Sequence, residues 1–199
     1  MIKIKVWGDI TEKTTSIVES AVASLINEEE PVLVVINSNG GTINDAIAIY
    51  NLLANLPNPL TTIIIGKCYS AATLLFNCGK KRYITKDSEY MIHQPLISMA
   101  SFYNLSDLKR QEKHLAKTLR LLKKYFFNKD IQIPKEKLDY AFKEGKDLYL
   151  SYKECLKYNI ATDIFTNWSE LYKKENINSA DEKIYLFEIS DVLVKDEEE

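Results

Sequence analysis

One serine and one histidine stand where they could act as a nucleophile and its base. Ser70 lies at an expected helix start among small residues that would leave its hydroxyl accessible, and His93 directly follows a short strand pattern. Histidine is the usual general base for a serine nucleophile. Each residue alone also fits a structural role, because serine commonly caps helices. Together they are candidates for a nucleophile and its general base.

The carboxylate that would orient the histidine stays open at this level. Such a group fixes the tautomer of the imidazole and stabilises the imidazolium. Asp87, Asp147 and Asp163 all fall near expected element ends. The second histidine, His114, lies on a Lys-rich helix, which favours a solvated role over catalysis.

A glycine-rich segment, residues 37–42 (NSNGGT), follows another buried-strand pattern. Paired glycines allow backbone conformations that other residues avoid, so backbone N–H groups can point outward and bind an anion or a developing oxyanion. An ordinary turn followed by a helix is the alternative interpretation. Ligands of open α/β sheets bind at the carboxyl ends of strands, which is where both this segment and Ser70 lie.

Hydrophobic periodicity predicts strands that alternate with helices. Strands are expected over residues 2–7, 31–36, 60–65, 82–85, 89–92, 148–150 and 183–189, with turns at 37–41 and Gly66. Helices are expected over residues 11–27, 42–56, 70–78, from the Ser106–Asp107 cap to about 126, 134–144, and from a capping box at Ser151 and Glu154 to about 159. Beyond Trp168 the pattern weakens to a polar loop at 176–181 and an acidic tail at 195–199. This alternation predicts an α/β domain with a largely parallel sheet.

The composition excludes several classes of protein. The chain has 199 residues, with 26 Lys and Arg against 28 Asp and Glu, which disfavours a general nucleic-acid binder. Its three cysteines show no metal-binding spacing and fit a reducing compartment. Cys68 with His93 would be an alternative thiol pair, although a buried role is more typical. With neither a signal-peptide pattern nor a membrane span, a cytoplasmic protein is expected. A metal or organic cofactor is not expected, because Ser-His-Asp chemistry needs none.

Four blocks of residues, in this order and spacing, resemble the Clp protease proteolytic subunit (ClpP) family of the ClpP/crotonase-like fold. They are residues 36–41 (INSNGG) with 48–50 (AIY), Gly66-x-x-x-Ser70, residues 90–96 (YMIHQPL), and residues 146–151 (KDLYLS) continuing through Glu154 and Tyr158 to Asp163. The resemblance covers about residues 2–166. The YMIHQPL block is its most specific part.

The resemblance implies an α/β fold of repeated ββα units with a protruding long helix. It implies a serine peptidase domain over residues 1–166, followed by a C-terminal extension, 167–199, with an acidic tail. Ser70 would be the nucleophile, His93 the general base and Asp147 the orienting carboxylate, with Asp163 structural. The resemblance assigns the oxyanion hole to backbone N–H groups of Gly41 and Ala71, with Gly40 shaping the turn.

The resemblance also implies partners and raises alternatives. Peptides or unfolded proteins would be the substrates, and the chain would form homo-oligomeric rings, including a stacked double heptamer. The first expected strand begins at Ile2, without the pore-lining segment of the family, so docking of a ring ATPase is less expected. Residues 97–104 replace a glycine-rich strand, and Lys146 replaces an arginine. An ATPase-independent phage-type maturation peptidase, a non-proteolytic ring or scaffold subunit and an acyl-CoA enzyme are the alternatives.

Overall fold

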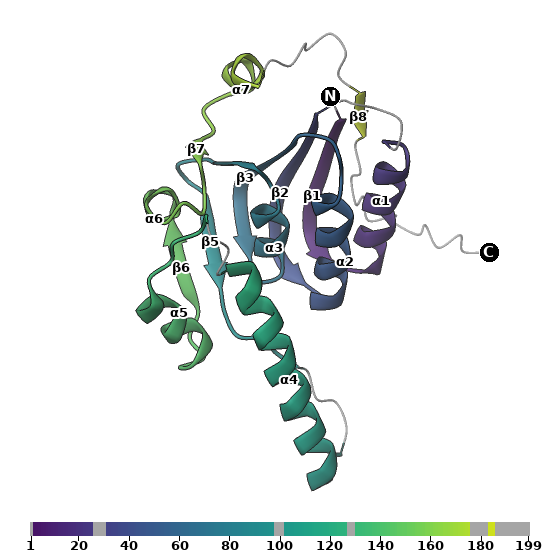
Figure 1. The fold of residues 1–199 in the computed structure, drawn as a ribbon, viewed down its shortest axis with the longest axis vertical. Coiled ribbons are helices and arrows are strands. Elements are labelled where there is room, and N and C mark those ends of the chain that lie inside the picture. Colours follow the sequence, from purple (N-terminus) through teal and green to yellow (C-terminus); the bar gives the residue numbers. More distant parts are fainter. Residues whose placement is uncertain (1, 26–30, 98–101, 127–129, 176–182, 186–199) are drawn as a thin grey trace, which may run out of the picture.

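A largely parallel sheet carries the elements of the site (Figure 1). The computed structural model describes residues 2–25, 31–97, 102–126, 130–175 and 183–185. The strands are β1 (Ile2–Ile10), β2 (Val32–Gly41), β3 (Leu60–Tyr69), β4 (Lys81–Ile84), β5 (Glu89–Ile92), β6 (Leu148–Ser151), β7 (Asp163–Ile164) and β8 (Lys183–Tyr185). The helices are α1 (Glu12–Ala23), α2 (Ile43–Ala54), α3 (Ala72–Asn77), α4 (Leu105–Phe126), α5 (Lys135–Phe142), α6 (Tyr152–Lys157) and α7 (Trp168–Lys174).

In the described ranges, eight strands form one sheet in the order β6-β5-β3-β2-β1-β8, with β4 paired to β3 and β7. All of these pairings are parallel except that of β5 with β6. Parallel neighbours place their carboxyl ends at the same edge of a sheet. The residues that follow β2, β3 and β5 therefore meet at one edge, and this is the edge that the sequence analysis singled out.

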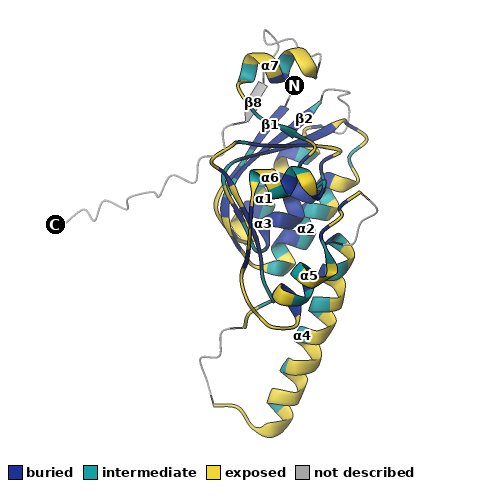
Figure 2. Ribbon diagram, turned by 90° about the vertical axis from the view of Figure 1, so that its left-hand side faces the viewer, coloured by how far each residue is buried: buried dark blue, intermediate teal, exposed yellow. Residues whose placement is uncertain are grey.

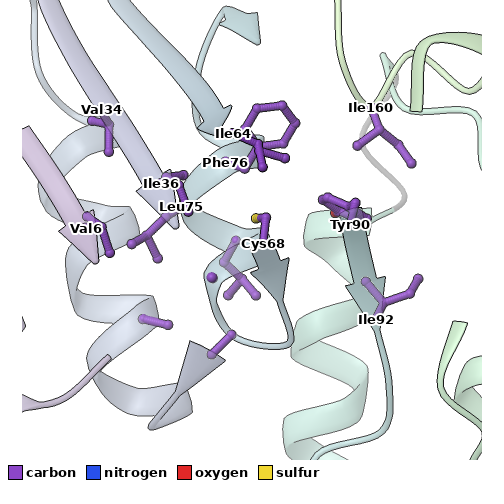
Figure 3. Packing of buried hydrophobic residues seen from close by; sticks show 14 of the residues in the cluster. Val6, Val34, Ile36, Ile64, Cys68, Leu75, Phe76, Tyr90, Ile92 and Ile160 are labelled. Carbon is purple, nitrogen blue, oxygen red and sulfur yellow. The ribbon is translucent and has the colours of Figure 1, made fainter. Parts of the chain in front are cut away.

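The apolar residues of β2 divide between two faces of the sheet because side chains alternate along a strand. Val34 and Ile36 belong to the larger core, together with residues of α1, α2 and α3 (Figure 3). Leu33 and Val35 belong to a smaller core on the other face, where Leu171 of α7 covers them. A strand buried on both faces reads as a continuous apolar run, as residues 31–36 do.

The predictions of turns at residues 37–41 and at Gly66 are wrong. β2 continues to Gly41 and β3 to Tyr69, and the register of both pairings shifts where the first strand segment ends. Gly40 and Gly41 have φ values of 97° and 149°. Such irregularities let a strand bend without ending, so the glycines mark a bulge rather than a turn.

Three further expectations concern helices. The capping box at Ser151 and Glu154 is confirmed. The Ser106–Asp107 cap is wrong: α4 already begins at Leu105, and Asn104 caps it, because Asn104 and Asp107 exchange hydrogen bonds between their side chains and backbone N–H groups. The weak pattern beyond Trp168 contains a helix, α7, which the sequence analysis missed.

Helix α4 extends away from the rest of the protein and is exposed along most of its length (Figures 1 and 2). Of its described residues only Leu122 and Phe126, in the last turn and a half, are buried. The protruding helix that the resemblance implied is thus present. The expected loop at 176–181 and the tail at 195–199 lie outside the described residues, as does most of the strand expected over 183–189, of which 183–185 form β8.

Candidate active site

Ser70 lies in the turn between β3 and α3 with a left-handed backbone conformation, φ 52°. Few non-glycine residues adopt this conformation, and those that do concentrate at functional sites. The Ser70 backbone N–H donates a hydrogen bond of 2.8 Å to the carbonyl oxygen of Met91 in β5, which holds the turn against the neighbouring strand. The expectation of a helix starting at residue 70 is therefore wrong by two residues, because α3 begins at Ala72.

His93 follows β5 directly, and its Nε2 lies 2.6 Å from the Ser70 Oγ. The pairing of β3 with β5, with Tyr69 opposite Met91, explains this closeness, because Ser70 follows Tyr69 directly and His93 lies two residues after Met91. A contact of this length is a hydrogen bond between hydroxyl and imidazole. The structure therefore brings together the serine and the histidine that the sequence analysis selected.

Asp147 immediately precedes β6, which is antiparallel to β5 with Ile92 opposite Leu148. One Asp147 carboxylate oxygen, Oδ1, lies 3.8 Å from His93 Nδ1, and the side chains are 52% and 17% exposed, respectively. This distance permits an ion pair but is too long for a hydrogen bond. Asp147 is thus the carboxylate placed beside the outer ring nitrogen of the histidine.

A side-chain bridge connects the histidine segment to the loop that carries this aspartate. The Gln94 amide Nε2 donates a hydrogen bond of 3.0 Å to the carbonyl oxygen of Phe142, at the end of α5. A Cβ atom added at Gly145 would lie 3.7–3.8 Å from the same amide, so the loop before Asp147 also passes close to Gln94. Gln94 therefore links the segment after β5 to the α5–β6 loop, and with it to Asp147.

The other candidates do not join this group. Asp163 pairs with Lys174 at 2.6 Å, and the hydrogen bond from that lysine lowers the pKa of the Asp163 carboxyl. Asp87 is exposed in the turn between β4 and β5. Cys68 is buried in the core, and burial raises the pKa of its thiol well above the usual value. A nucleophilic thiol needs the opposite shift, so the Cys68–His93 alternative is disfavoured.

Gly40 lies against the turn that carries the serine. A Cβ atom at Gly40 would come within 2.7 Å of the Tyr69 carbonyl oxygen, 2.8 Å of the Ser70 Cβ and 3.0 Å of the Ala71 nitrogen. The Gly40 N–H itself donates to the Ser38 hydroxyl at 3.0 Å. Only glycine lets the end of β2 approach the Ser70 turn this closely.

A cleft of about 750 Å³ opens in front of Ser70 and His93. Its walls come from the ends of β1 and β2, the segment after β5, and α4. The lining includes Asp9, Asn39, Gly41, Ile43, Met91, Leu96, His114, Leu115 and Thr118. His114 was expected to be solvated, and it is exposed, but it also borders this cleft. Helical periodicity shows which residues share a face of a helix, not what lies opposite that face, so no local pattern could place His114 at this cleft.

A smaller, mostly apolar recess adjoins the same serine. Ser70 and His93 line this recess, and its apolar lining residues are Ile43, Leu74, Ile92, Leu122 and Phe126. A site with apolar walls and a few polar groups at one end is typical of ligand binding.

The described part of the chain contains no group of three or more His, Cys, Asp or Glu side chains placed to hold a metal ion. None of its helices is long and apolar enough to cross a membrane.

Comparison with known proteins identifies the family. The sequence model of the Clp protease family matches residues 2–168. The chain belongs to the Clp protease family. Members of this family are serine peptidases, so the expected enzyme class is confirmed at the family level. The four blocks of residues that resemble the family all lie within the matched range.

Several relatives support this membership. An ATP-dependent Clp protease proteolytic subunit 1 from Protochlamydia amoebophila is 27% identical over 152 residues, which are 74% of this chain and 71% of the relative. A subunit of the same name from Chlamydia trachomatis is 26% identical over 166 residues, 81% of this chain and 85% of the relative. The proteolytic subunit from Bigelowiella natans is 30% identical over 144 residues, 71% of each chain.

A solved structure supports the fold. A ClpP1 mutant from Listeria monocytogenes superposes with a TM-score of 0.70 and 20% sequence identity, covering 85% of this chain and 94% of that one. The α/β, ClpP/crotonase-like fold class expected from the sequence is thereby confirmed.

Proposed function

We propose that this member of the Clp protease family is a serine endopeptidase in which Ser70 is the nucleophile, His93 the general base and Asp147 the residue that orients His93. The contact of 2.6 Å between His93 Nε2 and Ser70 Oγ is the observation that carries the proposal. A nucleophile within hydrogen-bond reach of a base, with a carboxylate beyond the base, is the arrangement that serine peptidases need.

The chemistry follows from these positions. His93 Nε2 takes the hydroxyl proton as Ser70 Oγ attacks the peptide carbonyl carbon, and the carbonyl oxygen becomes an oxyanion. The C–N bond then breaks, and His93 returns the proton to the departing amine. Water attacks the acyl-enzyme through the same histidine, which releases the carboxylic acid and restores the serine. Neither metal nor organic cofactor enters this sequence.

We assign the oxyanion hole to the backbone N–H groups of Ala71 and Gly41. Ala71 directly follows the nucleophile, and Gly41 lines the cleft beside it. Gly40 shapes the hole without donating to it, because its N–H already donates to Ser38. Backbone donors fixed in this way stabilise the charge that develops on the carbonyl oxygen.

Asp147 acts on His93 most strongly once substrate is bound. In the free protein its carboxylate is half exposed and 3.8 Å from His93 Nδ1. Catalytic hydrogen bonds that are long in a free enzyme often shorten in the complex with substrate. A peptide that fills the cleft would exclude water from this pair and strengthen the attraction between them.

The substrate we propose is an extended peptide or an unfolded protein. The cleft is open to solvent, and the small recess beside Ser70 has mostly apolar walls, so it suits at most a small apolar side chain next to the bond that is cleaved. Folded proteins keep their backbone paired in secondary structure, so they cannot enter such a cleft without unfolding.

We further propose that the chain works as a homo-oligomeric ring, including a stacked double heptamer, in the cytoplasm, with a ring ATPase as a candidate partner. Exposed apolar side chains at the outer end of α4 and just before it support an assembly, because such clusters mark contacts between proteins; they include Phe102, Leu105 and Leu108. The free cysteines support a reducing compartment. The division at residues 166 and 167 stays a prediction.

The intact mass of the protein after treatment with a fluorophosphonate tests the proposal. A single adduct is expected on the wild type, and none on Ser70→Ala or His93→Ala. Cys68→Ala is the matched control and should label like the wild type. Labelling of Ser70→Ala would refute the assignment of the nucleophile. If the wild type stays unlabelled while a known serine protease labels fully, the non-proteolytic scaffold becomes the better explanation.

A further inference from the structure

Helix α4 carries a row of cations on one face. Lys113, Lys117 and Arg120 are spaced three or four residues apart, so their side chains project from the same side of the helix, and all three are exposed. The helix contains seven Lys and Arg against two Asp and Glu, although these types are nearly balanced over the whole chain, 26 against 28. Positive charge is thus concentrated on the helix that borders the cleft.

The three cations of this row have no ion-pair partner among the described residues. On the same helix, Arg110 differs, because it pairs with Asp107 one turn earlier. Lys113, Lys117 and Arg120 therefore keep their charge available for an anionic group from outside the chain.

His114 connects this row to the cleft. It follows Lys113 in the chain and lines the cleft together with Ser70 and His93. Asp9 is the single carboxylate among the residues that line this cleft. It lies at the end of β1, and α4 forms a different wall of the cleft. A peptide that leaves the cleft past His114 therefore runs toward cations rather than carboxylates.

We propose that the enzyme prefers substrates with acidic side chains on the α4 side of the bond that is cleaved, where they meet the row formed by Lys113, Lys117 and Arg120. This preference rests on the proposed peptidase function. Each contact between exposed charges is weak and screened by salt, but several of them together change kcat/KM by about tenfold at low ionic strength. Repulsion of lysine-rich segments adds to the discrimination.

Three matched peptides test the proposal. All three have the same apolar residue before the cleaved bond. On one side of that bond they carry three Glu, three Gln or three Lys residues, and in a second set of three peptides these residues lie on the other side. For one of the two sides, kcat/KM should fall from Glu to Gln to Lys, by about tenfold overall at low salt. The differences should shrink at about 0.5 M salt, where the screening length is only a few ångströms.

The decisive variant is Lys113→Glu/Lys117→Glu/Arg120→Glu, which should reverse the order of the peptides. Lys80→Glu/Lys153→Glu/Lys157→Glu is the control, because it changes the net charge equally at exposed lysines that do not line the cleft. The control should keep the wild-type order. Light scattering checks the assembly of each variant. If the reversed variant does not assemble, Lys113→Gln/Lys117→Gln/Arg120→Gln replaces it and should abolish the preference.

Two failures are distinguishable. If the wild type forms no fluorophosphonate adduct and cleaves none of the peptides, the proposed peptidase function fails. If it labels and cleaves but shows no charge preference on either side, or if the α4 variants keep the wild-type preference, the inference about acidic substrates is overturned while the peptidase function stands.

Discussion

Gly40 makes no proposed chemical contact with substrate, yet the position of the nucleophile depends on it. Its φ of 97° disfavours any side chain. An added Cβ would also lie 2.8 Å from the Ser70 Cβ. We predict that Gly40→Ala loses fluorophosphonate labelling and about 2 kcal/mol or more of unfolding free energy, because strain and steric overlap add. Intact-mass labelling and urea unfolding measure the two effects.

Gly8→Ala is the matched control for this prediction. Gly8 also has a positive φ, 80°, but nothing lies within 4 Å of an added Cβ. Gly8→Ala should lower the unfolding free energy by about 1 kcal/mol, through backbone strain alone, and leave fluorophosphonate labelling intact. Equal labelling of the two variants would show that the close approach of β2 to the Ser70 turn is unimportant.

A second prediction concerns the carboxylate beside His93. Asp147→Asn should lower kcat for peptide hydrolysis by about a hundredfold or more, because the amide neither stabilises the imidazolium nor holds the productive tautomer. The side chain is 52% exposed, so the fold should tolerate the change. Glu144→Gln, a nearby exposed carboxylate, is the control in the same assay. An unchanged kcat in Asp147→Asn would contradict the orienting role.

At the residue level, local patterns in the sequence were enough to select some residues of the candidate site but not all of them. Ser70 and His93 followed from residue type and their place after strands, whereas Asp147 could be chosen from three aspartates only by the resemblance to the family. The hydrogen bond between Gln94 and Phe142 and the position of His114 depend on where α5 and α4 lie in space. No local pattern in a single sequence contains that information.

Among the elements, α7 is held to the sheet by both apolar and polar contacts. Leu171 is buried against Leu33, Val35 and Ile63, on the face of the sheet opposite the larger core. Immediately after the helix, Glu175 accepts a hydrogen bond of 2.6 Å from the Tyr83 hydroxyl and also pairs with Lys81. This helix therefore completes one face of the core.

We predict that Leu171→Ala destabilises the protein by about 2–4 kcal/mol, the usual cost of truncating a buried leucine. Lys173→Ala, exposed on the same helix, is the control and should change stability by less than about 0.5 kcal/mol. Urea unfolding measures both. A small effect of Leu171→Ala would mean that α7 is only loosely attached to the sheet.

Strands were easier to predict than their ends. The β-branched runs that begin at residues 31 and 60 correctly predicted β2 and β3. Both strands continue past the expected turns because a register shift lets glycine-containing segments keep pairing. Helix α7 was missed because seven residues contain too few turns to establish a helical period.

For the molecule as a whole, buried thiols make stability fall as the pH rises into the alkaline range. Burial, the larger cause, and the charge of Glu154 raise the pKa of the Cys155 thiol from 9.0 to about 12. Burial also raises the pKa of Cys68. Below pH 9 such thiols are protonated in both the folded and the unfolded protein, so they do not make stability depend on pH. Above it, the unfolded thiol ionises while the folded one keeps its proton, so stability falls as the pH rises.

The expected fall in unfolding free energy is about 1.4 kcal/mol per pH unit for each such thiol, between about pH 9 and the raised pKa. Urea unfolding at pH 7.5, 9 and 10, under reducing conditions, measures it. Cys155→Ala removes one ionising group, so its stability should fall less steeply over the same range, although its stability at neutral pH is lower. Parallel curves for variant and wild type would contradict the assignment.

The shape of α4 has one more consequence, for the rate at which its amide hydrogens exchange with solvent. Its described residues are buried only at Leu122 and Phe126, so the turns nearer Leu105 rest mainly on local contacts: hydrogen bonds within the helix, its Asn104–Asp107 cap and the Asp107–Arg110 ion pair. Helical segments this short are marginal in water without a neighbour. In the isolated chain these amides should exchange within seconds, and any partner that packs on them should slow the exchange. The outer turns of α4 are therefore a built-in reporter of assembly, readable in deuterium uptake without a label or a substitution.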